Sequence, residues 1–197
     1  MVPWSGRPVI LCSHFGVSTS FLRFNPASLA FVVLALVLTS GCQSPEHQLK
    51  KELATLRVHL EVSASETNQT QFVSIPRDQP VAFKVKNAPF LTEGEVKEAK
   101  LVSVIGGFEL QIQFDFTGSL LLEEYSGAYK GRHFAILSQF VNPANEKLNI
   151  ERWLAAPRAS RRITDGILTF TPDASREEAD KIVLGLNNLA RKQGLQK

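Results

Sequence analysis

Histidine and acidic side chains are the residues of this 197-residue chain that could carry out acid–base chemistry or bind a metal. None of the four histidines, His14, His47, His59 and His133, has a histidine three or four residues away to complete a metal pair on a helix. His59 and Glu61 lie two residues apart on a predicted strand, so they share its polar face. They form either an acid–base pair or, as we favour, a solvated surface. The sequence therefore predicts no metal, no cofactor and no catalytic residue.

A cluster of basic residues, Arg158, Arg161 and Arg162, follows Trp153. One interpretation is contact with anionic lipid headgroups or an acidic partner, because each basic side chain near an anionic surface contributes about 1 kcal/mol. The other, which we favour, is a solvated loop with Trp153 in the core. The chain has no phosphate-binding loop, dinucleotide fingerprint or nucleophile elbow. We therefore expect a protein that is not an enzyme, with a small hydrolase carrying an unrecognised site as an alternative.

Cys42 is the residue for which the sequence predicts a definite modification. All 19 acidic residues lie after position 42, and Arg23 precedes a 12-residue apolar run, Ala27–Leu38. A bilayer span takes about 20 residues, so this run has the length of a signal-peptide core instead. The segment Leu38–Cys42 resembles the lipobox of bacterial lipoproteins. That resemblance implies acylation of the Cys42 thiol, cleavage after Gly41 and attachment to a membrane through lipid.

These motifs predict a signal peptide over residues 1–41, whose start we expect to be over-extended, and a polar tether over 42–52. The net charge of +3 falls to +1 once the first 42 residues are removed, so the remaining chain gives no reason to expect nucleic-acid binding. Gln43 stands where inner-membrane lipoproteins carry Asp, which favours the outer membrane. We expect a lipid-anchored protein of the cell envelope that faces the periplasm.

The elements that follow the tether predict an α+β fold. Apolar and polar residues alternate along short segments, as in half-buried strands, and two capping boxes, Thr92 with Glu95 and Ser175 with Glu178, mark helix starts. The predicted strands are Leu56–Val62, Gln71–Ile75, Val81–Lys86, Lys100–Ile105, Phe108–Phe116, His133–Phe140, Ile150–Ala156 and Gly166–Thr171, with helices at Thr117–Lys130 and from Ser175 onward. Gly106-Gly107 predicts a hairpin turn, and Val141–Asn149 a loop.

Four short motifs follow one another between residues 89 and 192: Phe90–Val96 with its threonine-led helix start, Gly131–Leu137, Trp153–Pro157 and Ser175–Ala179. This order resembles the head subdomain of the first periplasmic domain of the preprotein translocase subunit SecD. The resemblance implies a fold at the membrane surface whose head engages extended polypeptides. It does not extend to the spanning helices of SecD, so proton-driven translocation is not implied.

We therefore expect residues 53–88 to add N-terminal strands to a SecD-head-like domain over 89–192. The expected architecture is a single antiparallel or mixed sheet with two main helices packed on one face. An exposed edge such as Phe108–Phe116 could accept an extended peptide by strand addition. The predicted function is a non-catalytic envelope lipoprotein that binds unfolded polypeptide, translocase subunits or other envelope proteins, in protein export. The alternative is a structural envelope lipoprotein with no export role, and the oligomeric state stays open.

Overall fold

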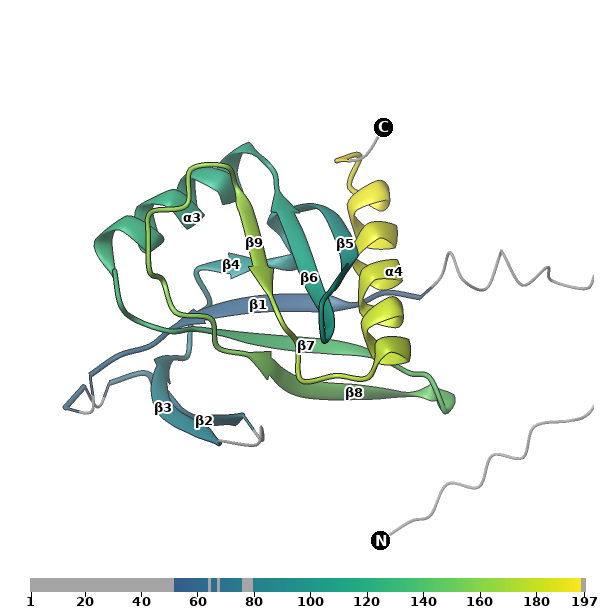
Figure 1. Ribbon diagram of the computed structural model, residues 1–197, viewed down its shortest axis with the longest axis horizontal. Helices are drawn as coiled ribbons and strands as arrows, with labels where there is room; N and C mark the ends of the chain where they lie inside the picture. Colours follow the sequence, from purple (N-terminus) through teal and green to yellow (C-terminus); the bar gives the residue numbers. More distant parts are fainter. Residues whose placement is uncertain (1–51, 64, 67, 76–79, 196–197) are drawn as a thin grey trace, which may run out of the picture. The chain divides into compact units, whose positions relative to one another are not determined.

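The computed structural model describes residues 52–63, 65–66, 68–75 and 80–195 (Figure 1). They fold into antiparallel strands and two α-helices, so the α+β prediction is confirmed. The helices are α3 (Phe116–Ala128) and α4 (Arg176–Lys192), and a single 3₁₀ turn, η1, covers Glu93–Glu95. The strands are β1 (Thr55–Leu60), β2 (Thr70–Ile75), β3 (Val81–Lys86), β4 (Leu91–Thr92), β5 (Val96–Val104), β6 (Gly107–Phe114), β7 (Phe134–Asn142), β8 (Asn145–Ala155) and β9 (Ile167–Phe170).

The strands form three sheets, so the predicted single sheet is wrong. One sheet has the order β4-β1-β7-β8, the second is the hairpin β2-β3, and the third has the order β5-β6-β9. β1 comes from the N-terminal segment but lies between β4 and β7 of the later segment. The alternation of apolar residues shows that a strand has a buried face, but it does not tell which sheet the strand joins.

The predicted loop Val141–Asn149 is also wrong, because β7 and β8 form a hairpin there. Asn142 pairs with Asn145, and the ladder continues from Val141 opposite Asn149. Four of the first five residues of β8 are polar and all five are exposed, and β8 is an edge strand of the four-stranded sheet. An exposed edge strand therefore has the composition of a loop, which explains the error.

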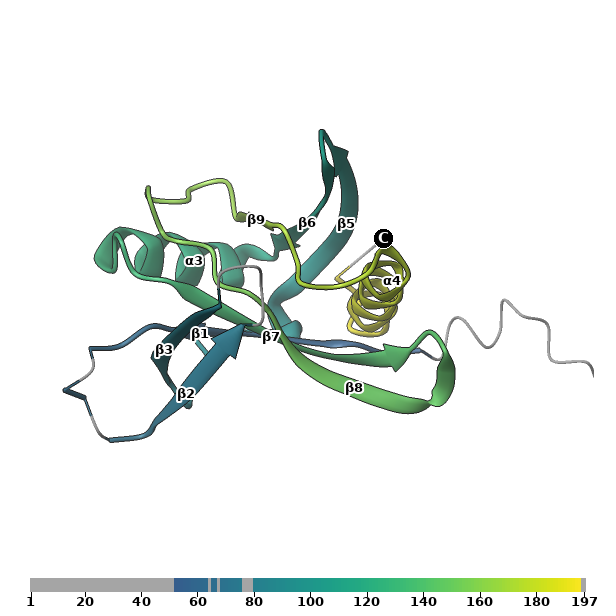
Figure 2. The same cartoon turned by 60° about the horizontal axis from the view of Figure 1, so that its bottom comes forward.

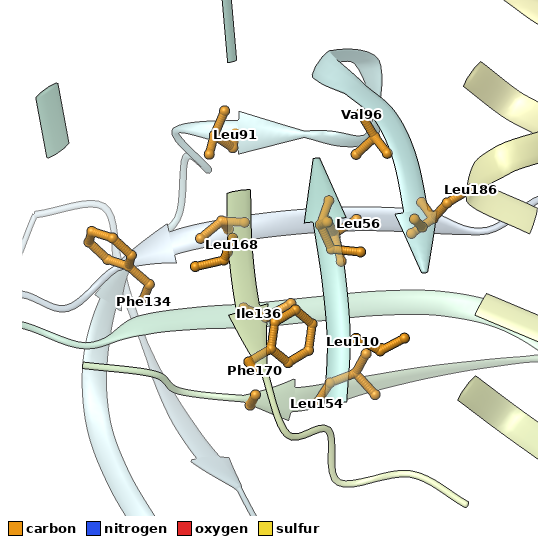
Figure 3. Close-up of a cluster of buried hydrophobic side chains, with 14 of the residues drawn as sticks. Leu56, Leu91, Val96, Leu110, Phe134, Ile136, Leu154, Leu168, Phe170 and Leu186 are labelled. Atoms are coloured by element: carbon orange, nitrogen blue, oxygen red, sulfur yellow. The ribbon is translucent and has the colours of Figure 1, made fainter. Parts of the chain in front are cut away.

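The main hydrophobic core lies between the four-stranded and three-stranded sheets, whose strands cross one another in Figure 1. Leu56, Ile136 and Leu154 enter it from one sheet and Leu110 and Leu168 from the other, as Figure 3 shows. Both helices contribute to the same core through Leu122 of α3 and Ile182 and Leu186 of α4. This shared core fixes the positions of the helices relative to both large sheets.

Both predicted capping boxes are confirmed. Thr92 and Glu95 cap η1, which extends for only three residues before β5 begins. Ser175 and Glu178 cap α4, with the Glu178 N–H 3.2 Å from Ser175 Oγ and the Ser175 N–H 2.8 Å from Glu178 Oε2. Each box satisfies backbone donors that the first turn of a helix leaves unpaired, which is why these starts are readable from the sequence.

Gly185 lets α4 pack closely against the chain that leads into β1. A Cβ atom at this position would lie 2.7 Å from Ala54 Cβ, closer than two carbon atoms can approach. Lys181, one turn earlier, forms an ion pair with Glu52 at 2.8 Å, and Asn188 donates to the Glu52 carbonyl oxygen at 2.9 Å. The start of the described chain is therefore attached to α4 by packing, charge and hydrogen bonding.

The hairpin β2–β3 packs on the opposite face of the four-stranded sheet, away from the main core (Figure 2). A second, smaller hydrophobic cluster forms there. Val73, Ile75 and Val85 of the hairpin are buried in it against Ala135 of β7, with Trp153 of β8 at its edge. The four-stranded sheet is thus covered on both faces, by layers of very different size.

Candidate functional site

The predicted arginine cluster lies on the surface, in the segment that joins β8 to β9. Arg158 donates from Nε to the carbonyl oxygen of Gly131 at 2.7 Å, and Arg162 forms an ion pair with Glu123 of α3 at 2.9 Å. Arg161 is exposed beside Arg158, at a groove of about 390 Å³. Two of the three guanidinium groups therefore already interact within the chain. Headgroup or acidic-partner contact remains a prediction for this cluster.

Trp153, the fourth predicted contact residue, lies at the edge of the small cluster under the hairpin β2–β3. Its ring meets the imidazole of His59 edge-to-face, with 5.2 Å between the ring centroids and an interplanar angle of 69°. Trp153 is half-buried on β8 and packs against this cluster, as the favoured core interpretation predicts.

His59 is buried, so its predicted place on a solvated strand face is wrong. Only 3% of the residue is exposed, because the hairpin β2–β3 covers the face of β1 that the alternation marks as polar. Nδ1 lies 2.9 Å from the carbonyl oxygen of Lys86, while Nε2 is buried without a hydrogen-bond partner. Burial lowers the pKa of His59, opposed by the hydrogen bond to Lys86 and assisted by the charge of Arg57. The neutral imidazole is therefore the form that this site stabilises.

Glu61 does not pair with His59 but with His133, a partner that the sequence pattern does not indicate. Glu61 Oε2 accepts from the backbone N–H of His133 at 2.7 Å and lies 2.8 Å from its Nδ1. The His133 ring also stacks on Phe83 of the hairpin, with 5.3 Å between ring centroids. The two residues are 72 positions apart, so no local spacing could have indicated the pair. The contact joins the end of β1, the start of β7 and the hairpin, so we interpret the pair as one that holds these segments together.

The predicted peptide-accepting edge, Phe108–Phe116, is wrong. β6 lies inside its sheet and pairs with β5 on one side and β9 on the other, so the edge strands are β5 and β9. The sequence did not reveal this because β9 joins the sheet from more than 50 residues further along the chain.

At the edge strand β5, the first half is covered by α4 and the second half is exposed. Asn187 of α4 accepts a hydrogen bond from the N–H of Ala99 and donates one to its carbonyl oxygen, both at 2.9 Å. Beyond Ala99 the strand runs into the hairpin turn, where Val102, Val104 and Ile105 are 37%, 40% and 107% exposed. Figure 2 shows this hairpin projecting past α4 and β9. Three neighbouring aliphatic side chains are thus exposed next to a sheet edge.

Among the described residues, no group of three or more His, Cys, Asp or Glu side chains is arranged to hold a metal ion. Neither helix in this part of the chain has the length and apolar character that a membrane span requires. Cys42 and Gly41, the predicted lipidation and cleavage residues, lie outside the described residues, as do the predicted signal peptide and most of the tether.

Comparison with solved structures finds SecDF chains. A membrane component SecDF that enhances protein export shares 18% identity and a TM-score of 0.48, covering 89% of this chain and 71% of that one. SecDF in a super-membrane-facing form shares 18% identity and a TM-score of 0.49, covering 74% of this chain and 21% of that one. SecDF from Thermus thermophilus, a translocon-associated membrane protein, shares 15% identity and a TM-score of 0.36, covering 82% of this chain and 33% of that one.

No protein-family profile matches this chain, and no curated protein matches its sequence. The TM-scores to the SecDF structures are all below 0.5, so the α+β class rests on the strands and helices of this chain itself.

Proposed function

We propose that this chain is a lipid-anchored, non-catalytic protein of the cell envelope that binds segments of unfolded polypeptide during protein export. Two features of the sequence support an envelope location: the lipobox-like Leu38–Cys42 and the acid-free, apolar leader before it. The resemblance of the motifs between residues 89 and 192 to the SecD head supports the export context. Fold does not fix function, so the binding activity needs a site of its own.

The observation that carries the proposal is the apolar surface at the tip of the β5–β6 hairpin. Val102, Val104 and Ile105 are all exposed, and Ile105 is fully so. Single exposed aliphatic residues are ordinary, but neighbouring ones on a projecting hairpin typically mark an interaction surface. A surface of this kind fits apolar side chains that a partner exposes only while unfolded.

The proposed binding can be tested with the full chain in lipid nanodiscs and reduced, carboxymethylated α-lactalbumin, which stays unfolded, as the probe. We expect saturable binding of this probe and no binding of native α-lactalbumin. Ile105→Lys is expected to weaken binding at least fivefold, because it places a charge at the hairpin tip. Leu148→Lys, at a 53% exposed position on β8, is the matched control and should change binding less than twofold. Equal affinity for native and unfolded probe would contradict the proposal.

The lipid anchor is tested separately with Cys42→Ala. The variant is expected to lose incorporation of radiolabelled palmitate and to move from the membrane to the soluble fraction of cells, because multiple acyl chains provide the anchor. A Cys42→Ser variant controls for the size of the side chain and should behave identically. Membrane fractionation that survives both substitutions would contradict lipid anchoring while leaving polypeptide binding open to the first experiment.

A further inference from the structure

The outer half of β5 carries backbone groups with no strand beside them. Among the described residues, β5 pairs with β6 alone, and Ala99 directs its N–H and carbonyl away from β6, toward Asn187. The register from Ala99 opposite Ile112 to Val104 opposite Gly107 is continuous. Because outward-directed residues alternate in an antiparallel ladder, Leu101 and Ser103 direct their N–H and carbonyl groups to the same side as Ala99.

Asn187 indicates which kind of ligand this edge takes. Its side-chain amide supplies one donor and one acceptor to Ala99, as the backbone of a neighbouring strand would. The helix α4 therefore substitutes for a strand at one position and leaves the next two outward positions, Leu101 and Ser103, uncovered. An extended peptide backbone lying beside Leu101 and Ser103 would provide the same donor and acceptor pairs that Asn187 provides to Ala99.

The side chains around the open edge define the sequence preference of such a strand. On one face, Leu101 and Phe108 are half-buried and pack against the main core. On the other face, Val102 and Val104 are exposed. A strand added beside β5 would place its alternating side chains next to aliphatic neighbours on both faces. The edge therefore favours apolar and β-branched residues.

We propose that the outer half of β5, Leu101–Val104, binds an extended, apolar polypeptide segment by strand addition; this inference rests on the proposed polypeptide-binding function. The open stretch is bounded by Asn187 at Ala99 and by the hairpin turn at Ile105. Two outward residues bury far less than the roughly 1,200–2,000 Å² that a stable protein–protein interface needs. The occupant is therefore a peptide segment of another chain, not a second copy of this protein.

The experiment removes one outward N–H from the edge. Ser103→Pro deletes that donor without deleting a bond to β6, and proline is tolerated on the free side of an edge strand. Ser103→Ala is the matched control, since it removes the hydroxyl but keeps the N–H. The probe is a fluorescein-labelled peptide of alternating valine and threonine with lysine at both ends, bound to the full chain in nanodiscs. We expect Ser103→Pro to raise its Kd at least tenfold and Ser103→Ala less than twofold.

Hydrogen exchange on the unaltered protein gives a second readout that does not depend on how well the proline variant folds. The peptide is expected to slow exchange of the Leu101 and Ser103 amides at least tenfold. The Val102 amide, already in the ladder with Glu109, should change little. Uniform protection of the whole hairpin, or none at these two amides, would overturn strand addition.

The remaining outcomes separate this inference from the function on which it rests. If neither the peptide nor carboxymethylated α-lactalbumin binds any variant, the proposed function fails. If α-lactalbumin binds equally to Ser103→Pro and Ser103→Ala, the polypeptide-binding function stands and the β5 edge is overturned as its site. If sedimentation detects a dimer that Ser103→Pro dissociates, the edge serves a second copy, which also overturns the inference.

Discussion

The four-stranded sheet separates two hydrophobic layers of unequal size. On one face, 22 of the described residues form the main buried cluster, from two sheets and two helices. On the other face, four described residues, Val73, Ile75, Val85 and Ala135, form the cluster under the hairpin β2–β3. Fully burying one such side chain stabilises a fold by about 1.5–3 kcal/mol, so the hairpin is held by far less than the rest.

Because of this difference, we expect the hairpin β2–β3 to detach from the sheet without unfolding of the main layer. A two-stranded hairpin is at best marginally stable by itself, so β2–β3 depends on its docking contacts. Those contacts include His59, a buried imidazole with one unpartnered nitrogen. Burying an unpaired polar atom costs free energy. We infer that undocking the hairpin takes less free energy than unfolding the main layer.

The largest effect is expected in the main layer. Leu186→Ala removes a fully buried side chain of α4 and should lower the free energy of unfolding by about 3 kcal/mol, through lost burial and the cavity left behind. Urea denaturation followed by circular dichroism measures it. Leu148→Ala, at an exposed position, is the control and is expected to change stability by less than about 0.5 kcal/mol. Similar losses for the two variants would contradict the described core.

How far the sequence predicts these layers depends on whether the signal is local. The caps at Thr92 and Ser175, and the β5–β6 hairpin around Gly106, are local, because capping and turn geometry involve residues at most three apart. Gly106 has a φ of 88°, a conformation that glycine adopts without strain. These elements lie within a few residues of the positions that the sequence predicts.

The rest depends on contacts between distant segments. His59 alternates like an exposed residue of β1, but the hairpin β2–β3 covers it, and nothing near position 59 indicates that cover. Phe108–Phe116 has the clearest alternation in the chain, but alternation does not tell whether a strand lies at an edge. Which strand becomes an edge is decided by β9, which pairs with β6 and leaves β5 at the border of the sheet. Local pattern therefore predicted the elements, whereas the candidate site required the topology.

A smaller effect, confined to the hairpin, is expected from Val85→Ala. Val85 is fully buried in the small cluster, and its truncation should weaken docking of β2–β3 by about 2 kcal/mol. Hydrogen exchange measures this as faster exchange of the β2 and β3 amides. Amides of β6 serve as the internal control and should keep their protection. Equal acceleration in β6 would mean that both layers unfold as one cooperative unit.

The docking of the hairpin should also weaken as the pH falls. Burial lowers the pKa of His59 below its ordinary value of 6.5. An undocked imidazole takes up a proton as the pH drops through 6.5, whereas the docked one stays neutral until its own lower pKa. Docking therefore loses stability across that interval and keeps it above pH 6.5. Fluorescence of Trp153, which contacts His59, measures the change, because the other tryptophan, Trp4, lies in the predicted signal peptide.

The control for this pH dependence is His59→Phe, which keeps a ring beside Trp153 but cannot be protonated. Its docking is expected to vary less with pH than that of the unaltered protein. The Glu61–His133 pair also lies beside the hairpin, so the comparison uses the difference between the two proteins and not the raw profile of either. An unchanged profile in His59→Phe would show that His59 is not the source of the pH dependence.

The smallest effect is expected at the surface of the main layer, where Arg162 pairs with Glu123. The Arg162 side chain is 63% exposed, and exposed ion pairs contribute roughly 0.2–1 kcal/mol, so Arg162→Ala should lower stability by less than about 1 kcal/mol. Urea denaturation at low salt and at 1 M salt measures this loss. The difference in stability between Arg162→Ala and the unaltered protein should be smaller at high salt, because salt screens the ion pair. Arg161→Ala is the matched control and should leave stability unchanged. A loss of several kcal/mol in the free energy of unfolding of Arg162→Ala would contradict this, because it would mean that the ion pair contributes substantially to the stability of the main layer.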